Sequence, residues 1–148
     1  DSRVFDTGGF KSTKTDMTVD DLYAKFLEVF GVARTHCVNM YGMTELSSQI
    51  YDQNLLSYYT DGSSNYLKAT PSWVRSVFLD PATLTPVADG EQGVIAHYDL
   101  ANWNSCLAIL TEDLGVRTDS GYELNGRAKG AEARGCSIAV DEVMAANA

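Results

Sequence analysis

Residues 39–48, Asn39-Met40-Tyr41-Gly42-Met43-Thr44-Glu45-Leu46-Ser47-Ser48, have the pattern of a strand that ends in a tight glycine turn. The stretch carries an aromatic ring, a hydroxyl and a carboxylate, on Tyr41, Thr44 and Glu45. An aromatic ring can stack on a base, a hydroxyl can bond a phosphate oxygen, and a carboxylate can hold Mg²⁺. Because Gly42 lets the backbone turn sharply, we expect Tyr41 and Glu45 to face one cavity. The alternative is an ordinary strand end with a solvated Glu45.

The composition is that of a folded protein with a marked negative charge. The chain has 148 residues, of which 45% are apolar, so it can bury a core. With 11 Lys and Arg against 20 Asp and Glu, the net charge of −9 argues against free nucleic acid and anionic membrane surfaces as partners. No apolar run approaches the roughly 18 residues of a membrane span, so we expect none.

The cysteines and the first residues bear on the compartment. Cys37, Cys106 and Cys136 are odd in number and widely spaced, and the sequence does not begin with a signal-peptide pattern. We therefore expect a reducing, cytoplasmic location. The sequence begins with Asp1 rather than Met, so we also expect it to be a fragment of a longer protein.

The N-terminal part has a strand-helix-strand pattern. Residues 3–7 predict a short buried strand, and Gly8-Gly9 ends it. From Val19 to Phe30 apolar residues recur at helical spacing after the N-cap candidate Thr18, and we interpret this stripe as core. Residues 35–41 predict the second strand. Ligand sites of α/β proteins commonly lie at the carboxyl ends of such strands.

The remainder is dominated by strand patterns. Residues 50–65 predict an irregular polar and aromatic loop with one short helical turn. Four strands then follow between turn residues, at Trp73–Leu79, Gly93–Tyr98, Leu107–Thr111 and Gly121–Leu124. They predict an antiparallel sheet or small barrel, and Ser137 begins a short terminal helix over residues 138–144. The fold class is therefore mixed α/β (α+β).

Four short segments resemble, in this order, motifs of the adenylate-forming superfamily, which includes acyl-CoA synthetases and luciferase. They correspond to a glycine pair against adenine, the adenylate-binding motif, an acidic turn of the barrel, and the ribose-binding and hinge motifs: Gly8-Gly9, Tyr41-Gly42-Met43-Thr44-Glu45, Asp89-Gly90-Glu91-Gln92-Gly93, and Thr111-Glu112-Asp113-Leu114-Gly115 with Gly126-Arg127-Ala128-Lys129. The resemblance implies that residues 1–65 are part of an α/β adenylate-binding subdomain. Residues 66–118 would be an antiparallel β subdomain, and residues 119–148 a hinge and truncated carboxyl-terminal segment.

Details of these segments resemble one branch, the acyl-protein synthetases of bacterial bioluminescence (LuxE type). The details are Gly8-Gly9-Phe10-Lys11, the Thr-Glu-Asp-Leu-Gly form, and Lys129-Gly130-Ala131-Glu132-Ala133-Arg134-Gly135-Cys136-Ser137. Such proteins activate a fatty acid as acyl-adenylate and pass the acyl group to a cysteine near their carboxyl terminus. The resemblance implies ATP and Mg²⁺ as cofactors, a carboxylic or fatty acid as substrate, and an acyl reductase as a partner. A CoA ligase of the phenylacetate-CoA ligase type and a catalytically silent nucleotide- or acyl-binding module are the alternatives.

The resemblance also implies a role for each nucleotide-binding residue. Gly8, Gly9, Tyr41 and Gly42 would lie at the adenine, Thr44 would bond the α-phosphate, and Glu45 would hold Mg²⁺. Asp113 would accept from the ribose hydroxyls, and Arg127 would contact ribose or phosphate. A turn aspartate and a solvated surface arginine are the corresponding alternatives.

Cys136 is the candidate for the second half-reaction. A thiolate can attack the mixed anhydride, and nearby Arg134 and a helix N-terminus would lower the thiol pKa. The alternative is a small buried cysteine. Cys37 and Cys106 lie in predicted strands and are expected to be inert core residues. Together with the histidines they are zinc-ligand types, but they lack the short paired spacing of structural zinc sites.

The resemblance covers only part of the superfamily's machinery. The upstream Ser/Thr/Gly-rich loop that grips the β- and γ-phosphates is not among these residues, nor is the mobile carboxyl-terminal domain with its late lysine. The second absence fits the LuxE branch. The first implies that a missing upstream domain of the same protein completes the site, and that this chain is inactive alone.

Overall fold

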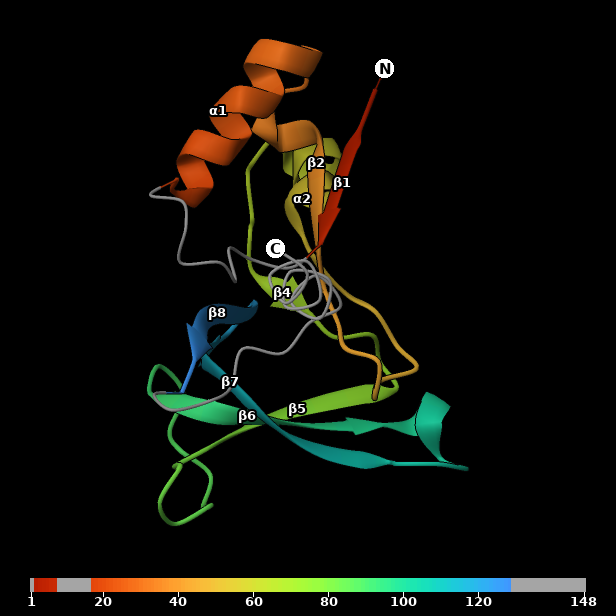
Figure 1. The fold of residues 1–148 in the computed structure, drawn as a ribbon, viewed down its shortest axis with the longest axis vertical. Coiled ribbons are helices and arrows are strands. Elements are labelled where there is room, and N and C mark those ends of the chain that lie inside the picture. Colours follow the sequence, from red (N-terminus) through yellow and green to blue (C-terminus); the bar gives the residue numbers. More distant parts are fainter. Residues whose placement is uncertain (1, 8–16, 129–148) are drawn as a thin grey trace, which may run out of the picture.

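A mixed eight-stranded sheet runs through the chain in a computed structural model that describes residues 2–7 and 17–128 (Figure 1). The strand order is β1-β2-β3-β4-β8-β7-β6-β5. Strand β1 pairs parallel with β2, and every other pairing in this sheet is antiparallel. The predicted mixed α/β fold is confirmed. The elements are β1 (Val4–Thr7), α1 (Val19–Phe30), η1 (Arg34–His36), β2 (Cys37–Tyr41), β3 (Ile50–Asp52), α2 (Asn54–Asp61), β4 (Lys68–Ala69), β5 (Val74–Leu79), β6 (Gln92–Asp99), η2 (Leu100–Asn102), β7 (Ala108–Thr118) and β8 (Gly121–Arg127).

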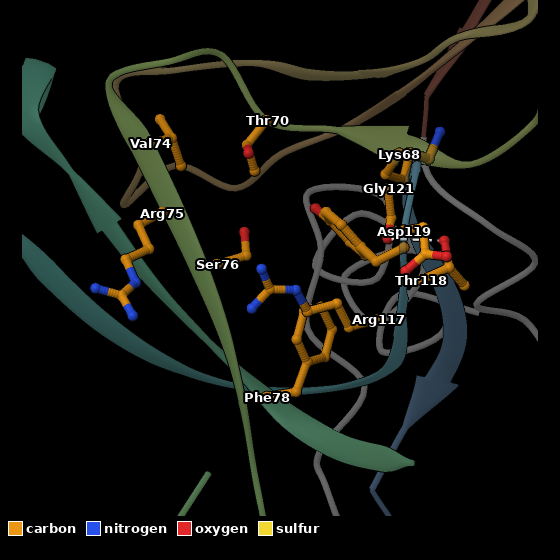
Figure 2. Close-up of a pocket in the computed structure, with 11 residues that line it drawn as sticks. Lys68, Thr70, Val74, Arg75, Ser76, Phe78, Arg117, Thr118, Asp119 and Gly121 are labelled. Carbon is orange, nitrogen blue, oxygen red and sulfur yellow. Dashed lines mark hydrogen bonds between the residues drawn. The ribbon is translucent and has the colours of Figure 1, made fainter. Parts of the chain in front are cut away.

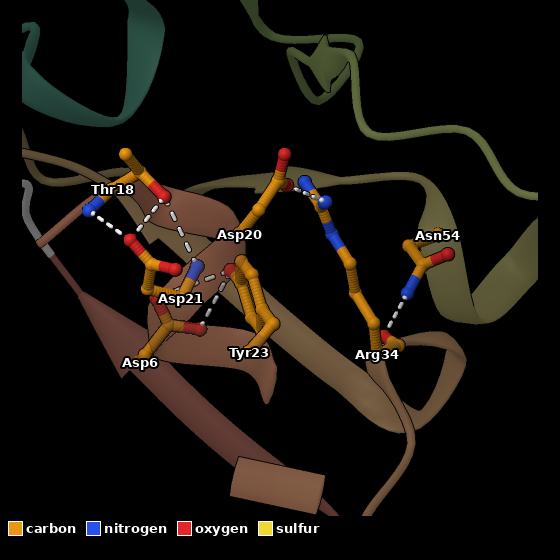
Figure 3. Close-up of polar contacts among 7 residues, drawn as sticks. All are labelled: Asp6, Thr18, Asp20, Asp21, Tyr23, Arg34 and Asn54. Carbon is orange, nitrogen blue, oxygen red and sulfur yellow. Dashed lines mark hydrogen bonds and ion pairs between the residues drawn. The ribbon is translucent and has the colours of Figure 1, made fainter. Parts of the chain in front are cut away.

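Helix α1 begins and ends where its sequence predicts. The Thr18 hydroxyl accepts from the backbone N–H of Asp21 at 3.1 Å, and the Asp21 carboxylate accepts from the Thr18 N–H at 2.9 Å, which forms a capping box (Figure 3). At the other end Gly31 takes the left-handed conformation with φ 66°. The Tyr23 hydroxyl donates to the Asp6 carboxylate at 3.3 Å and so attaches the helix to β1.

The interpretation of the α1 stripe as core is wrong for the outer part of the stripe. Tyr23 is buried with Val32 and Cys37, and Phe26 packs at the edge of this cluster. The outer residue Phe30, however, is 62% exposed, and Val19 and Leu27 are also exposed. The helix lies at one end of the molecule (Figure 1) and packs against the sheet through one narrow side only. Its apolar face is therefore wider than the surface that packs against it, and the outer apolar side chains stay exposed.

The segment predicted as an irregular loop is more regular than expected. Residues 50–65 contain β3 and the eight-residue helix α2, which ends at Gly62 with φ 77°. Asn54 at the start of α2 is fully buried and donates from Nδ2 to the carbonyls of Arg34 at 2.6 Å and Cys37 at 3.1 Å. This tertiary anchoring stabilises a helix whose own sequence has only a weak helical pattern.

The predicted strands of the second half are present, with shifted ends. Strand β7 continues to Thr118 and pairs with both β6 and β8, so it is much longer than its predicted segment. Residues 35 and 36 belong to η1, and β2 begins at Cys37. Cys37 is buried as predicted, but Cys106 lies just before β7 and is exposed, which corrects its assignment to the core. The predicted terminal helix lies outside the described residues.

The main core joins the residue 42–48 loop to the antiparallel strands. Its buried residues are Leu46, Ile50, Val74, Phe78, Ile95 and Tyr122. Tyr41 and Met43 pack against this cluster, so the motif stretch is part of the core boundary. Neither described helix has the length and apolar character needed to cross a membrane.

Candidate functional site

Tyr41, Asp113 and Arg127 meet at the end of β2. The Tyr41 hydroxyl donates to Asp113 Oδ2 at 2.7 Å, and Arg127 Nε lies 3.4 Å from Asp113 Oδ1. Arg127 also pairs through Nη2 with Glu112 Oε2 at 2.5 Å. Three residues from separate resembling segments are therefore in direct contact, although 72 positions separate Tyr41 from Asp113.

A neutral histidine extends this group into the core. His97 on β6 is fully buried, with Nε2 3.3 Å from the Tyr41 hydroxyl and Nδ1 2.9 Å from Ser76 Oγ. Burial lowers the pKa of His97 to about 4, although the Asp113 and Asp99 carboxylates oppose the change. Burial, together with Asp113, raises the pKa of Tyr41, so its hydroxyl keeps its proton.

The hydrogen-bond network assigns the proton positions on His97. Because Tyr41 donates to Asp113, its oxygen accepts from His97, which places the imidazole proton on Nε2. His97 Nδ1 then accepts from the Ser76 hydroxyl. From the sequence, His97 was a candidate only as a zinc-ligand type. Its position in an apolar strand, on the same face as Ile95, was the available signal for a buried, hydrogen-bonded role.

Local irregularity in β7 aims the Asp113 side chain. The β7–β8 register shifts between Asp113 and Gly115, and such bulges redirect side chains. The Asp113 N–H donates to Thr111 Oγ1 at 3.1 Å, and Thr111 itself donates to the Ile95 carbonyl at 2.8 Å. A Cβ on Gly115 would lie 2.7 Å from the Glu123 carbonyl oxygen and 2.9 Å from Phe78 Cε1. Close packing therefore requires glycine at position 115.

Thr44 and Glu45 lie apart from this network on an exposed loop. Thr44 lines a hollow of about 300 Å³ with Met40, Gly42, Met43, Leu46, Ser47, Ser48 and Gln49, and neither Tyr41 nor Glu45 belongs to its lining. Gly42 is not among the described glycines with positive φ, and a Cβ there would meet only Met40 Cε, at 3.9 Å. The turn therefore does not depend on glycine in this conformation.

Buried polar residues of β6 and η2 hold this loop, and they were not among the residues predicted from the sequence. Asp99 and Asn102 bond the backbone and hydroxyls of residues 45–48. Trp73 Nε1 donates to Ser48 Oγ at 2.9 Å. The only sequence signal was an acidic residue at the end of an apolar strand, which turn chemistry alone also explains.

A second hollow, of about 400 Å³, lies where β5 faces β7 and β8 (Figure 2). Its lining includes the cations Lys68, Arg75 and Arg117. It also includes Ser76, whose hydroxyl is hydrogen-bonded to His97. Of the predicted nucleotide-binding residues that the structure describes, none lines it. Three predicted site residues, Gly8, Gly9 and Cys136, lie outside the described residues, so their roles stay predictions.

Comparison with solved structures identifies the fold. The chain is similar to apo MatB from Rhodopseudomonas palustris, with a TM-score of 0.56, 18% identity, and coverage of 86% of this chain and 26% of that one. A luciferase-like enzyme from the mealworm Zophobas morio gives a TM-score of 0.54 at 17% identity, covering 88% of this chain and 32% of that one. The fold is that of the adenylate-forming enzymes, which confirms the predicted resemblance.

The family comparison is more specific. Residues 1–145 match the family described as "Acyl-protein synthetase, LuxE", and the chain belongs to this family. It is 26% identical over 155 residues to the long-chain-fatty-acid–luciferin-component ligase of Aliivibrio fischeri, covering 95% of this chain and 37% of the relative. The corresponding ligase of Vibrio harveyi is 27% identical over 90 residues, covering 56% of this chain and 24% of the relative. The match therefore spans little more than a third of the Aliivibrio relative and about a quarter of the Vibrio relative.

Proposed function

We propose that the protein carrying this chain is an ATP-dependent acyl-activating ligase, and that this chain supplies the nucleoside side of its site. The observation that carries the proposal is the contact of Tyr41 with Asp113, and of Asp113 with Arg127, at the carboxyl end of β2. Family membership and the adenylate-forming fold support it.

Asp113 is suited to hold the ribose. Tyr41 and Arg127 each engage one carboxylate oxygen, and a carboxylate has about four acceptor sites, so sites remain for two ribose hydroxyls. Arg127 holds the carboxylate in a fixed orientation. Neutral His97 keeps the Tyr41 ring in place without adding a charge beside the nucleoside.

Thr44 and Glu45 fit the phosphate side and Mg²⁺. Among residues 2–7 and 17–128 no three His, Cys, Asp or Glu side chains gather to form a metal site. This suits Mg²⁺, which commonly binds one or two carboxylates and takes its remaining ligands from substrate phosphates and water. Glu45 would supply that carboxylate, Thr44 would donate to an α-phosphate oxygen, and bound Mg²⁺ would offset phosphate charge. The β- and γ-phosphate contacts would come from an upstream domain of the same protein.

The first reaction joins the acid to AMP. A carboxylate oxygen of the acid attacks the α-phosphorus in line, a new P–O bond forms, and the bond to the leaving pyrophosphate breaks. The acid is already ionised at neutral pH, so no side chain needs to remove a proton. The residues around the nucleotide therefore act by positioning and by neutralising charge.

The second reaction transfers the acyl group to a cysteine. The Cys136 thiolate attacks the acyl carbonyl carbon, a thioester forms, and AMP leaves with the electron pair of the broken C–O bond. Cys37 is unsuited to this role because it is buried and burial raises its thiol pKa. The name of the Aliivibrio relative supports a long-chain fatty acid as the substrate. A cytoplasmic location and an acyl reductase as the next acceptor complete the proposal.

Exchange of labelled pyrophosphate into ATP tests the first reaction. The full-length protein should catalyse exchange that depends on a fatty acid and on Mg²⁺. Asp113→Asn should raise the KM for ATP by roughly tenfold, because loss of one hydrogen bond to a charged group costs about 1.5 kcal/mol. Asp89→Asn, on a distant acidic turn, is the matched control. If no carboxylic acid supports exchange, the ligase proposal fails in favour of a silent binding module.

Denaturing electrophoresis with labelled fatty acid tests the acceptor. Label should stay on the wild-type protein, be released by hydroxylamine, and disappear in Cys136→Ser. Cys106→Ser, which removes an exposed cysteine, should retain the label. Label that persists in Cys136→Ser would exclude that cysteine, and a free coenzyme A thioester would favour the CoA-ligase alternative.

A further inference from the structure

The loop that carries Thr44 and Glu45 has exposed side chains but an anchored backbone. Asn102, at the end of η2, is 8% exposed and donates from Nδ2 to the Glu45 carbonyl at 2.7 Å. The same amide donates to the Cys106 carbonyl at 2.9 Å, and its Oδ1 accepts from Ser47 Oγ at 3.0 Å. One buried amide therefore joins the loop to both ends of the β6–β7 connection.

Asp99 supports this amide from the preceding residues. Its Oδ2 accepts from the Ser48 N–H at 2.9 Å, and its Oδ1 accepts from the Ser48 hydroxyl at 2.8 Å and the Ala101 N–H at 3.0 Å. Asp99 has no exposed surface. A buried carboxylate with three donors resists displacement, because moving it would leave a desolvated charge without partners. Asp99 thus fixes η2 and the end of the loop as one unit.

We propose that Asn102, supported by Asp99, is a positioning residue for Glu45 and Thr44. This inference rests on the proposed function. Asn102 bonds the backbone carbonyl of Glu45, the residue whose carboxylate would hold Mg²⁺. The hydrogen bond therefore fixes the position of the backbone from which that side chain extends. An exposed side chain on an unanchored loop would have to be ordered each time Mg²⁺ and ATP bind. The anchor removes this cost before binding.

A buried asparagine elsewhere provides a matched control. Asn54 is also buried, and its Nδ2 also donates to two backbone carbonyls, those of Arg34 and Cys37. It lies at the start of α2, away from the loop. Asn102→Ala and Asn54→Ala each remove two side-chain donations to backbone carbonyls, Asn102→Ala also removes the bond from Ser47, and both should lower thermal stability. A difference between them in Mg²⁺ dependence reports positioning rather than folding.

The experiment measures the Mg²⁺ concentration for half-maximal pyrophosphate exchange in the full-length protein, at a temperature where all variants are folded. Asn102→Ala should raise it about tenfold, the usual effect of removing an outer support of a metal ligand. Asn54→Ala should leave it within about twofold of wild type. An unchanged value in Asn102→Ala, with wild-type exchange intact, overturns the positioning role and leaves the ligase proposal standing. Absence of exchange in the wild type overturns both.

A milder variant keeps the inference testable if Asn102→Ala does not fold. Ser47→Ala removes only the exposed hydroxyl that donates to Asn102 Oδ1. Its expected effect is a smaller rise in the half-maximal Mg²⁺ concentration, about twofold to threefold, with a smaller loss of thermal stability than in Asn102→Ala. A wild-type Mg²⁺ dependence in Ser47→Ala, when Asn102→Ala is unfolded, overturns the positioning role.

Discussion

Acid should destabilise this protein through His97. Its pKa in the folded state is about 4, against 6.5 for an unburied histidine. Between these values the unfolded chain holds the extra proton, so the free energy of unfolding falls as the pH falls. The stabilisation is fully present above pH 6.5 and is lost by about pH 4. At about 1.4 kcal/mol per pH unit the full loss is about 3 kcal/mol, of which about 2 kcal/mol appears by pH 5.

Urea unfolding followed by tryptophan fluorescence at pH 7 and pH 5 measures this loss. Other groups also titrate in this interval, so the test is the difference between wild type and His97→Gln. Glutamine keeps a donor and an acceptor but cannot take up the proton. The variant should lose some stability at pH 7 through imperfect hydrogen bonds. Between pH 7 and pH 5 it should lose about 2 kcal/mol less than the wild type.

Ile95→Val is the control for general core damage. Ile95 is fully buried on the same strand, and the substitution should cost about 1 kcal/mol at both pH values without changing the pH dependence. Equal pH dependence in wild type and His97→Gln would refute the reasoning. It would mean that water reaches His97 in the folded protein and that its pKa is not lowered there.

Three further predictions concern the site and its supports. Tyr41→Phe should cost about 1 to 2 kcal/mol of stability in urea unfolding and raise the KM for ATP, because it leaves buried His97 and half-buried Asp113 without their shared hydroxyl; an unchanged stability would contradict the network. Gly115→Ala should cost about 1 to 3 kcal/mol, whereas Gly42→Ala should change thermal stability little, since of these two positions only 42 has room for a Cβ. Equal effects of these two would contradict the packing argument. Lys68→Ala should cost about 3 kcal/mol in urea unfolding, because Lys68 is buried and bonds Asn39, whereas Lys25→Ala on the exposed face of α1 should be nearly neutral.

The limits of sequence-based prediction are clearest in α1 and in residues 50–65. The α1 boundaries follow from Thr18, Asp21 and Gly31, because capping is a local interaction between near neighbours. The exposure of Phe30 depends on what packs against the helix, which periodicity cannot report. Residues 50–65 lacked a strong helical pattern, and Asn54 decides their structure through carbonyls far away in the sequence.

The sequence by itself determined the mixed α/β class, the strand that carries Tyr41 and the family resemblance, because these depend on local spacing and on short motifs. Only the tertiary structure decided that Tyr41 bonds Asp113, that His97 is neutral and buried behind them, and that Asn102 anchors Glu45. These contacts span long sequence separations and depend on strand pairing and on an irregular register in β7. Burial then sets the protonation of His97 and makes each buried polar group require a partner, and no local pattern in the sequence records either effect.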